Sequence, residues 1–214
     1  MNRPQRLLAG LLLTGVAVMG AGCDGDPAST AAPVSTDGPL EDPAQEGGVS
    51  IDRPRGVGDR WTGSFGSLPL CVDEDGAEIR VEEVRVLESR GTVQDLTALV
   101  ATPEPGLRGD LLFLSARGSA PDFTEPYANK DEAEAASGYT FEPAQGAVID
   151  TVCGATHKDP NLVLQFTTDA DGGTIAEWEV RYVSDDKEYT TGPVPWEVTL
   201  CGRSSTHLCG PPPA

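Results

Sequence analysis

The sequence predicts an all-β protein whose folded part is an antiparallel β-sandwich of about eight strands, immunoglobulin-like or related to that fold. Two observations support this prediction. Short segments within residues 56–210 alternate apolar and polar side chains, which is typical of strands with one buried face. Turn-forming pairs such as Asp-Gly and Gly-Gly separate these segments at intervals of about 8–12 residues. A small β-barrel is the alternative architecture.

The clearest alternation lies near the C-terminus, in residues 161–167, 174–183 and 194–200. Because the side chains of a strand point alternately to its two faces, every second residue of these segments is expected in the core. Ile175 falls in the phase of the polar residues and is predicted to face solvent. Further strands are expected near residues 61–70, 93–101, 110–115 and 147–153. The residues predicted to face the core are Leu162, Leu164, Phe166, Ala176, Trp178, Val180, Tyr182, Trp196, Val198 and Leu200.

A change of phase interrupts the strand predicted for residues 79–86. Two apolar residues before the doubled glutamate, Glu82 and Glu83, lie in the opposite phase to the two that follow it. A β-bulge adds one residue to one strand of a pair and would bring all four apolar residues to the same face. We therefore expect a bulge at the glutamates. The four apolar residues are Ile79, Val81, Val84 and Val86.

Residues 118–146 break the strand pattern and form an unusually long connection. We expect one short helix in it, with Thr124 as N-cap, Pro126 in the first turn and Gly138 at its end. Four of the twelve aromatic residues lie in this segment, and exposed aromatic side chains are good anchors for a protein or glycan partner. The alternative is that they pack the helix over an open end of the sandwich. These candidate binding residues are Phe123, Tyr127, Tyr139 and Phe141.

Residues 1–22 have the layout of a secretory signal peptide rather than that of a membrane span. Arg3 and Arg6 precede an uncharged apolar run that is shorter than the roughly 20 residues of a spanning helix, and small residues follow it. The next segment is rich in Pro, Gly and acidic residues and poor in large apolar ones, so we expect it to be disordered. The chain therefore divides into a signal peptide (1–22), a disordered linker (23–55), a β-sandwich domain (56–210) and a short tail (211–214).

Ala21, Gly22 and Cys23 follow the apolar run directly. This arrangement resembles the lipobox of bacterial lipoproteins, and the excess of arginine over lysine, twelve to three, resembles proteins of high-GC bacteria such as actinobacteria. The resemblance implies that the Cys23 thiol carries a diacylglyceryl group, that the signal is cut before it and that the new N-terminus is acylated. We therefore expect a protein held by lipid on the extracytoplasmic face of the cell membrane. The alternative is ordinary cleavage without a lipid.

Without residues 1–22 the chain has 13 basic and 34 acidic residues, a formal charge of −21. Nucleic acid is disfavoured as a partner, because phosphate binding requires a basic surface. An anionic lipid surface would also repel this protein, so attachment to a membrane would depend on the lipid at Cys23.

Four cysteines remain besides Cys23, and an even number in an oxidising compartment predicts two disulfides. If the strands alternate up and down, Cys71 and Cys153 lie at strand ends on the same pole of the sandwich. Cys201 then lies at the other pole, with Cys209 only eight residues further along the chain. Among the three possible pairings we therefore favour Cys71–Cys153 and Cys201–Cys209.

Metal binding is a weaker interpretation of the same residues. His157 and His207 lie near Cys153 and Cys209 and could complete a Cys₂His₂ zinc set, but no closely spaced cysteine pair accompanies them. The acidic turn that begins at Asp169 departs from a calcium loop where that loop needs its sharp-turn glycine. We expect no metal and no cofactor.

No motif for a nucleophile elbow, a zinc protease or a phosphate-binding loop occurs in the sequence. His157 and His207 are its only imidazoles, which are the usual general bases near neutral pH. We therefore expect a binding or interaction module of the cell envelope, with an envelope protein or a glycan as its partner. An envelope hydrolase with an unrecognised site and a passive structural component are the alternatives.

Overall fold

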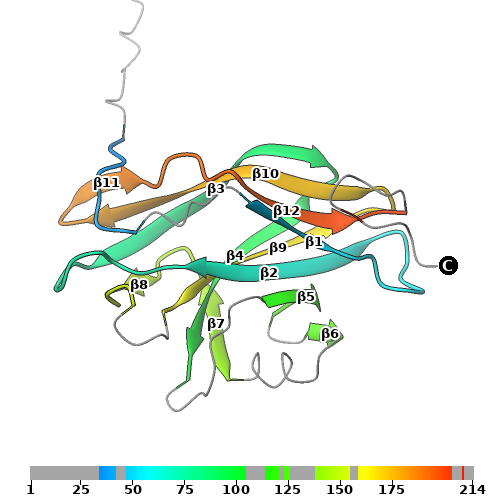
Figure 1. Ribbon diagram of the computed structural model, residues 1–214, viewed down its shortest axis with the longest axis horizontal. Helices are drawn as coiled ribbons and strands as arrows, with labels where there is room; N and C mark the ends of the chain where they lie inside the picture. Colours follow the sequence, from blue (N-terminus) through cyan, green and yellow to red (C-terminus); the bar gives the residue numbers. More distant parts are fainter. Residues whose placement is uncertain are drawn as a thin grey trace, which may run out of the picture. The chain divides into compact units, whose positions relative to one another are not determined.

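A computed structural model describes residues 34–41, 47–104, 114–120, 123–125, 138–154, 159–203 and 209. Within these residues twelve strands form two six-stranded sheets that pack against each other (Figure 1). The predicted β-sandwich is therefore confirmed, with more strands than expected. Several predictions fall outside the described residues: the signal peptide, the lipid site at Cys23, residues 126–137 of the expected helix, and the tail. The expected N-cap of that helix, Thr124, lies within a strand of residues 123–125, so this part of the prediction is wrong.

The first sheet has the strand order β1-β12-β10-β3-β8, and β11 pairs with β10 beside this path. The pairing of β1 with β12 is parallel and the other pairings are antiparallel, so this sheet is mixed. Its strands are β1 (Gly47–Ile51), β3 (Ile79–Gly91), β8 (Val148–Ile149), β10 (Gly172–Ser184), β11 (Lys187–Thr190) and β12 (Trp196–Cys201).

The second sheet has the order β6-β5-β2-β9-β4-β7 and is antiparallel throughout. Its strands are β2 (Trp61–Pro69), β4 (Gln94–Pro103), β5 (Leu114–Gly118), β6 (Phe123–Glu125), β7 (Tyr139–Pro143) and β9 (Asn161–Thr168).

The hydrophobic core lies between the sheets and is built from the alternating residues that the pattern predicts. Phe65 of β2 stacks on Trp196 of β12 with ring centroids 6.4 Å apart, so an aromatic contact joins the two layers. Gly63 of β2 approaches Leu200 of β12 so closely that an added Cβ would lie 2.5 Å from that side chain. The largest fully buried side chains include Trp178, Tyr182, Phe65, Phe166, Leu162 and Leu164.

The bulge expected in β3 is confirmed. The pairing with β10 passes from Glu83 opposite Arg181 to Val81 opposite Tyr182, so Glu82 is the additional residue. The extra residue corrects the phase of the strand and turns apolar side chains on both sides of it toward the core. Ile79 and Val81 are fully buried, and Val84 and Val86 pack against the core.

Two further details concern β10 and its hairpin. Ile175 is fully buried and not exposed as its phase predicts, because the pairing of β10 with β3 shifts between Ile175 and Glu177. A two-residue turn follows β10, and Ser184 pairs with Lys187 across it. Its two central aspartates have φ angles of 49° and 60°, as a two-residue turn of type I′ requires. They are Asp185 and Asp186.

Part of the segment predicted to be a disordered linker belongs to the folded domain. β1 pairs with β12 along its full length, although four of its five residues are not fully buried. Residues 34–41, which we call the N-terminal strap, make backbone hydrogen bonds to β11 and to the chain between β2 and β3. The boundary expected at residue 56 is therefore wrong. Composition reports how much apolar surface a segment can bury, whereas these segments are held mainly through their main chain.

Deletion of Glu82 tests the role of the bulge. Without this residue one side of β3 must slip by one position, which turns either Ile79 and Val81 or Val84 and Val86 toward solvent. We expect the free energy of unfolding to fall by at least about 2 kcal/mol, because exposing a buried valine or isoleucine costs about 1.5–3 kcal/mol. The matched control is Glu82→Ala, which keeps the residue count and should stay within about 0.5 kcal/mol of wild type. Equal urea-unfolding curves for both variants would contradict the assignment.

Candidate functional site

The aromatic residues proposed as a binding patch do not gather at one place in the described part of the chain. Tyr139 and Phe141 lie on β7, and the side chain of Tyr139 is only 7% exposed. Phe123 lies on β6 at the opposite edge of the six-stranded second sheet. Tyr127 and both histidines lie outside the described residues. Tyr139 therefore contributes to packing and does not offer an exposed contact.

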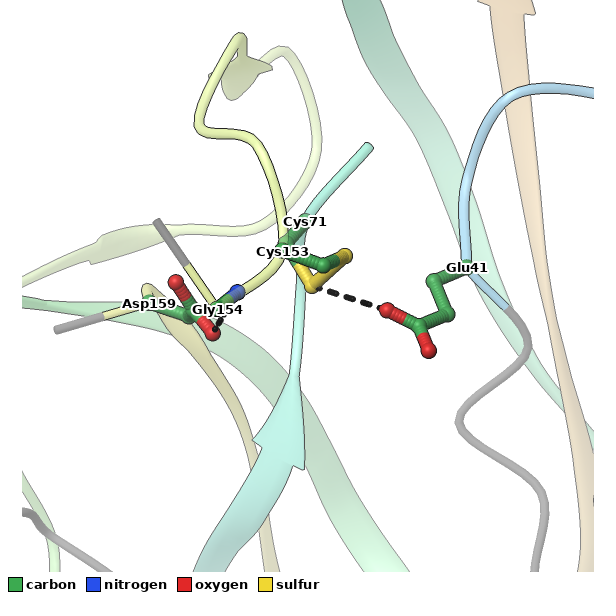
Figure 2. Close-up of a disulfide and its surroundings, with 5 residues drawn as sticks. All are labelled: Glu41, Cys71, Cys153, Gly154 and Asp159. Atoms are coloured by element: carbon green, nitrogen blue, oxygen red, sulfur yellow. Dashed lines mark hydrogen bonds between the residues drawn. A yellow bond between two sulfur atoms is a disulfide. The ribbon is translucent and has the colours of Figure 1, made fainter. Parts of the chain in front are cut away.

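Both predicted disulfides are present, Cys71–Cys153 with Cα atoms 4.9 Å apart and Cys201–Cys209 with Cα atoms 5.8 Å apart. The first joins the chain after β2 to the chain after β8, and the carboxylate of Glu41 lies 3.7 Å from the Cys71 sulfur (Figure 2). Because all four sulfur atoms are bonded in pairs, neither a zinc set with Cys153 and Cys209 nor a metal between Glu41 and the first disulfide has a thiolate ligand available.

Backbone hydrogen bonds hold the chain firmly around the first disulfide. The Val72 N–H donates to the Thr151 carbonyl at 2.9 Å, and the Cys153 N–H donates to the Val72 carbonyl at 3.0 Å. The strap adds a third segment here, because the Glu41 N–H donates to the Cys71 carbonyl at 3.0 Å. The disulfide therefore lies where three distant segments of the sequence meet.

The strap also packs on a pair of tyrosines that face each other across the β10–β11 hairpin. The rings of Tyr182 and Tyr189 stack with centroids 5.6 Å apart. Gly38 lies against both side chains, and an added Cβ would come within 2.3 Å of the Tyr182 hydroxyl. Burial raises the pKa of Tyr182 to about 12, against the opposing effect of a backbone hydrogen bond with Leu40. This tyrosine is therefore a neutral, structural residue at any physiological pH.

The described residues form an open groove of about 820 Å³, which we call the flank groove. Its lining includes residues of β3 and β4, which belong to different sheets, and residues at the end of β7 and in the turn after it. The groove also reaches the β10–β11 hairpin and Tyr189. Its lining includes Glu82, Glu83, Val84, Leu96, Thr97 and Gln145.

The flank groove exists because strand pairing stops on both of its walls. The Val81 N–H donates to the Ala147 carbonyl at 2.9 Å, and the Gly146 N–H donates to the Val81 carbonyl at 2.8 Å. Beyond Val81, no described strand pairs with that edge of β3. On the other wall the Ala144 N–H donates to the Ala98 carbonyl at 2.9 Å, and the edge of β4 before Ala98 likewise lacks a described strand neighbour. The groove is therefore lined by two strands that each have an edge without a neighbour among the described strands.

The corner between β3 and β4 is unusually exposed for a sandwich. Nine of the eleven residues from Leu87 to Thr97 are exposed, including Leu87 at 38% and Leu96 at 36%. These two are among only three large apolar residues that are exposed in the described part of the chain; the third is Val148. Single exposed leucines are ordinary, but two on one corner beside free strand edges are typical of an interaction surface.

Charged residues cover the outer face of the first sheet. Arginines and glutamates alternate there along β3 and β10 and pair with one another, so this face remains in water. Exposed ion pairs contribute only about 0–1 kcal/mol each, so their main effect is solubility. The pairs are Arg80–Glu82, Arg85–Glu179, Arg181–Glu188 and Arg90–Glu197.

A second hollow, of about 570 Å³, lies on the other side of Tyr189 between the strap and the chain before β3. Its lining contains carboxylates and no basic residue, and we call it the acidic pocket. It shares Tyr189 with the flank groove, so the two hollows are neighbours. Its acidic residues are Asp37, Asp73, Glu74, Asp75, Glu78 and Asp185.

The acidic turn between β9 and β10 uses its carboxylate to join two turns. The Thr92 hydroxyl donates to Asp169 at 2.5 Å, and the Asp171 N–H donates to the same carboxylate at 2.9 Å. These hydrogen bonds, that of Thr92 first, lower the pKa of Asp169 below its ordinary value. The stabilisation that results is present above the ordinary pKa of an aspartate and is lost as the pH falls through the lowered one.

The first serine of the stretch GSFGS, Ser64, makes hydrogen bonds that hold neighbouring segments of the chain together. Ser64 is fully buried, and its hydroxyl donates to the Gly118 carbonyl at 2.9 Å and lies 3.2 Å from the side-chain oxygen of Gln165. The same oxygen accepts the Ala120 N–H at 2.9 Å. Ser64 and Gln165 therefore fix the chain after β5 onto the outer face of the second sheet.

Comparisons of the chain with models of protein families, with curated proteins and with solved structures found no match. The described residues contain no helix that is long and apolar enough to cross a membrane. The flank groove was not predicted from the sequence, because its residues come from five separate strands. The one available signal was the phase break at Glu82 and Glu83, which marks the point where β3 leaves its second neighbour.

Proposed function

We propose that this protein is a lipid-anchored extracytoplasmic binding module that takes an extended segment of an envelope protein into the flank groove. The observation that carries the proposal is the meeting of two free strand edges, β3 beyond Val81 and β4 before Ala98, across one groove. An exposed edge offers a row of unpaired N–H and C=O groups, and an extended peptide satisfies them by adding as a further strand.

The side chains around the groove support a specific partner over uncontrolled association. Charged residues flank both edges, and register shifts in the pairing of β3 with β10 occur at Glu82 and again beside Leu87. Charges and bulges on an edge strand disfavour pairing between copies of one chain. Between the two register shifts, β3 pairs regularly with β10 only from Glu83 to Val86. A bound segment would thus pair over about four residues and take its remaining affinity from apolar contacts with Leu96, which lines the groove.

The anchor in this proposal is the lipid on Cys23. Two disulfides agree with an oxidising compartment outside the cytoplasm. Two or more acyl chains hold a protein durably on a bilayer, at about 0.8 kcal/mol for each buried CH₂, whereas one chain is marginal. The strong acidity of the chain then serves solubility and disfavours contact with anionic lipid.

The anchor is tested by detergent phase separation of the protein made in its own cells. Wild type should enter the detergent phase, and Cys23→Ala should remain in the aqueous phase, because it has no thiol to accept the lipid. Cys23→Ser is a second variant that keeps the size of the side chain and should behave in the same way. A wild-type protein that is already aqueous contradicts the anchor.

The groove is tested by a photo-crosslinking amino acid at Thr97, which lines it, compared with the same amino acid at Asp171, which lies on the turn between β9 and β10 outside the groove lining. We expect a discrete crosslinked protein from position 97 only. Leu96→Asn should reduce its yield at least tenfold, which corresponds to the loss of one apolar anchor worth about 1.4 kcal/mol or more.

The matched control is Val148→Asn, which makes the same uncharged change at an exposed apolar residue outside the groove lining. It should leave the yield unchanged. An equal effect of both variants, or the same product from position 171, would contradict binding in the flank groove. Thermal unfolding of each variant excludes a general loss of folding as the cause.

A further inference from the structure

The strap determines where the folded domain begins, and so how far it can lie from an anchor at Cys23. The Thr190 N–H of β11 donates to the Ser35 carbonyl at 2.9 Å, and the Asp73 N–H donates to the Pro39 carbonyl at 2.9 Å. Leu40 is 6% exposed and belongs to the core cluster. The chain is therefore fastened to the domain from its first described residues, beside the β10–β11 hairpin (Figure 1).

The distance available between anchor and domain follows from chain length alone. Eleven Cα–Cα steps separate Cys23 from Val34, and a chain spans at most about 3.6 Å per residue, so this segment reaches about 40 Å at most. A domain that began at Gly56 would instead have had a reach of about 120 Å. The strap therefore reduces the greatest possible distance of the domain from the anchor to about a third.

The two ends of the domain are not equivalent with respect to this short connection. β10 runs from Gly172 to Ser184, and at about 3.3 Å per residue it spans about 40 Å. Its C-terminal end carries the β11 hairpin, to which the strap is bound. The connection to the anchor therefore starts from the strap-side end of the domain, and the end at Gly172 lies a full strand length from that point.

We propose that the flank groove opens toward the membrane-anchored end and receives a cationic, extended segment of a protein held at the same membrane surface. This proposal rests on the lipid anchor and the peptide-binding role given above. Tyr189, which lines both hollows, is also the residue against which Gly38 of the strap packs. The groove is therefore next to the strap, at the end of the domain from which the connection to the anchor starts.

Charge selects the class of partner. The acidic pocket beside the groove has six carboxylates and no basic group in its lining, and the two arginines of the groove already pair with glutamates. Anionic lipid headgroups are repelled by this end of the domain, so the bilayer itself does not close the groove. A segment that carries lysine or arginine is attracted to the same surface, and the attraction decreases with salt.

The orientation is tested on vesicles that carry an energy-transfer acceptor on their lipid headgroups. The lipidated protein carries a fluorescent amino acid either at Lys187, in the hairpin beside the strap, or at Asp171, at the far end of β10. We expect the transfer efficiency to be higher at position 187. Insertion of twenty Gly/Ser residues between Pro33 and Val34 should remove the difference. Equal efficiencies, or a higher value at position 171, in the uninserted protein would overturn the proposal.

A missing lipid anchor is recognised by a separate measurement, flotation of the vesicles in a density gradient. A protein without the lipid does not float with the vesicles. In that case the free thiol of Cys23 is coupled to a maleimide lipid, and the same comparison between positions 187 and 171 is made on the coupled protein. The difference in transfer efficiency between the two positions then tests the orientation as before. The failed flotation contradicts only the lipid anchor.

The partner class is tested with two synthetic octapeptides, one alternating lysine with valine and one alternating glutamate with valine. We expect the lysine peptide to bind at least tenfold more tightly in low salt. Leu96→Asn should weaken it several-fold and Val148→Asn should not. Equal binding of the two peptides, or binding that does not respond to Leu96→Asn, would overturn the assignment of a cationic segment to the groove.

Discussion

The pairing of β3 with β10 is the interaction on which the rest of this structure depends. It joins two 13-residue strands and presents opposite chemistry on its two faces. On the inner face Trp178, Val180 and Tyr182 form the centre of the core, and on the outer face arginines and glutamates form ion pairs. The same pair carries the β11 hairpin at one end, and beyond Val81 the outer edge of β3 has no neighbour among the described strands. The strap and the flank groove both follow from it.

Main-chain hydrogen bonding explains why the sequence predicted some parts of the fold and missed others. The sandwich, the bulge at Glu82 and the hairpin turn before Lys187 leave a signal in side-chain periodicity or in turn residues. β1 and the strap leave little, because each contributes a single large apolar residue to the core, Ile51 and Leu40, and the rest of each segment is held by backbone partners. Such partners become known only when the strand order is known.

The candidate site illustrates the same limit. The aromatic residues of the long connection were visible in the sequence, but Tyr139 lies buried on an edge strand, and Phe123 lies on the opposite edge. The flank groove is formed by the absence of a neighbour beside β3 and β4. Whether a strand has a neighbour depends on the order of the strands in the sheet, which side-chain periodicity does not reveal. The pairing of the four later cysteines was predictable, because strand ends alone place Cys71 near Cys153.

The central claim is that the chain from Val34 onward is part of the domain and fixes its distance from the anchor. Native-state hydrogen exchange measures this directly at the amides that bind the strap or belong to it, those of Thr190, Asp73 and Glu41. We predict that they exchange as slowly as the Val194 amide, which pairs with Trp178 inside the first sheet. Exchange of these three amides at the rate of an unstructured chain, with Val194 protected, would contradict the account.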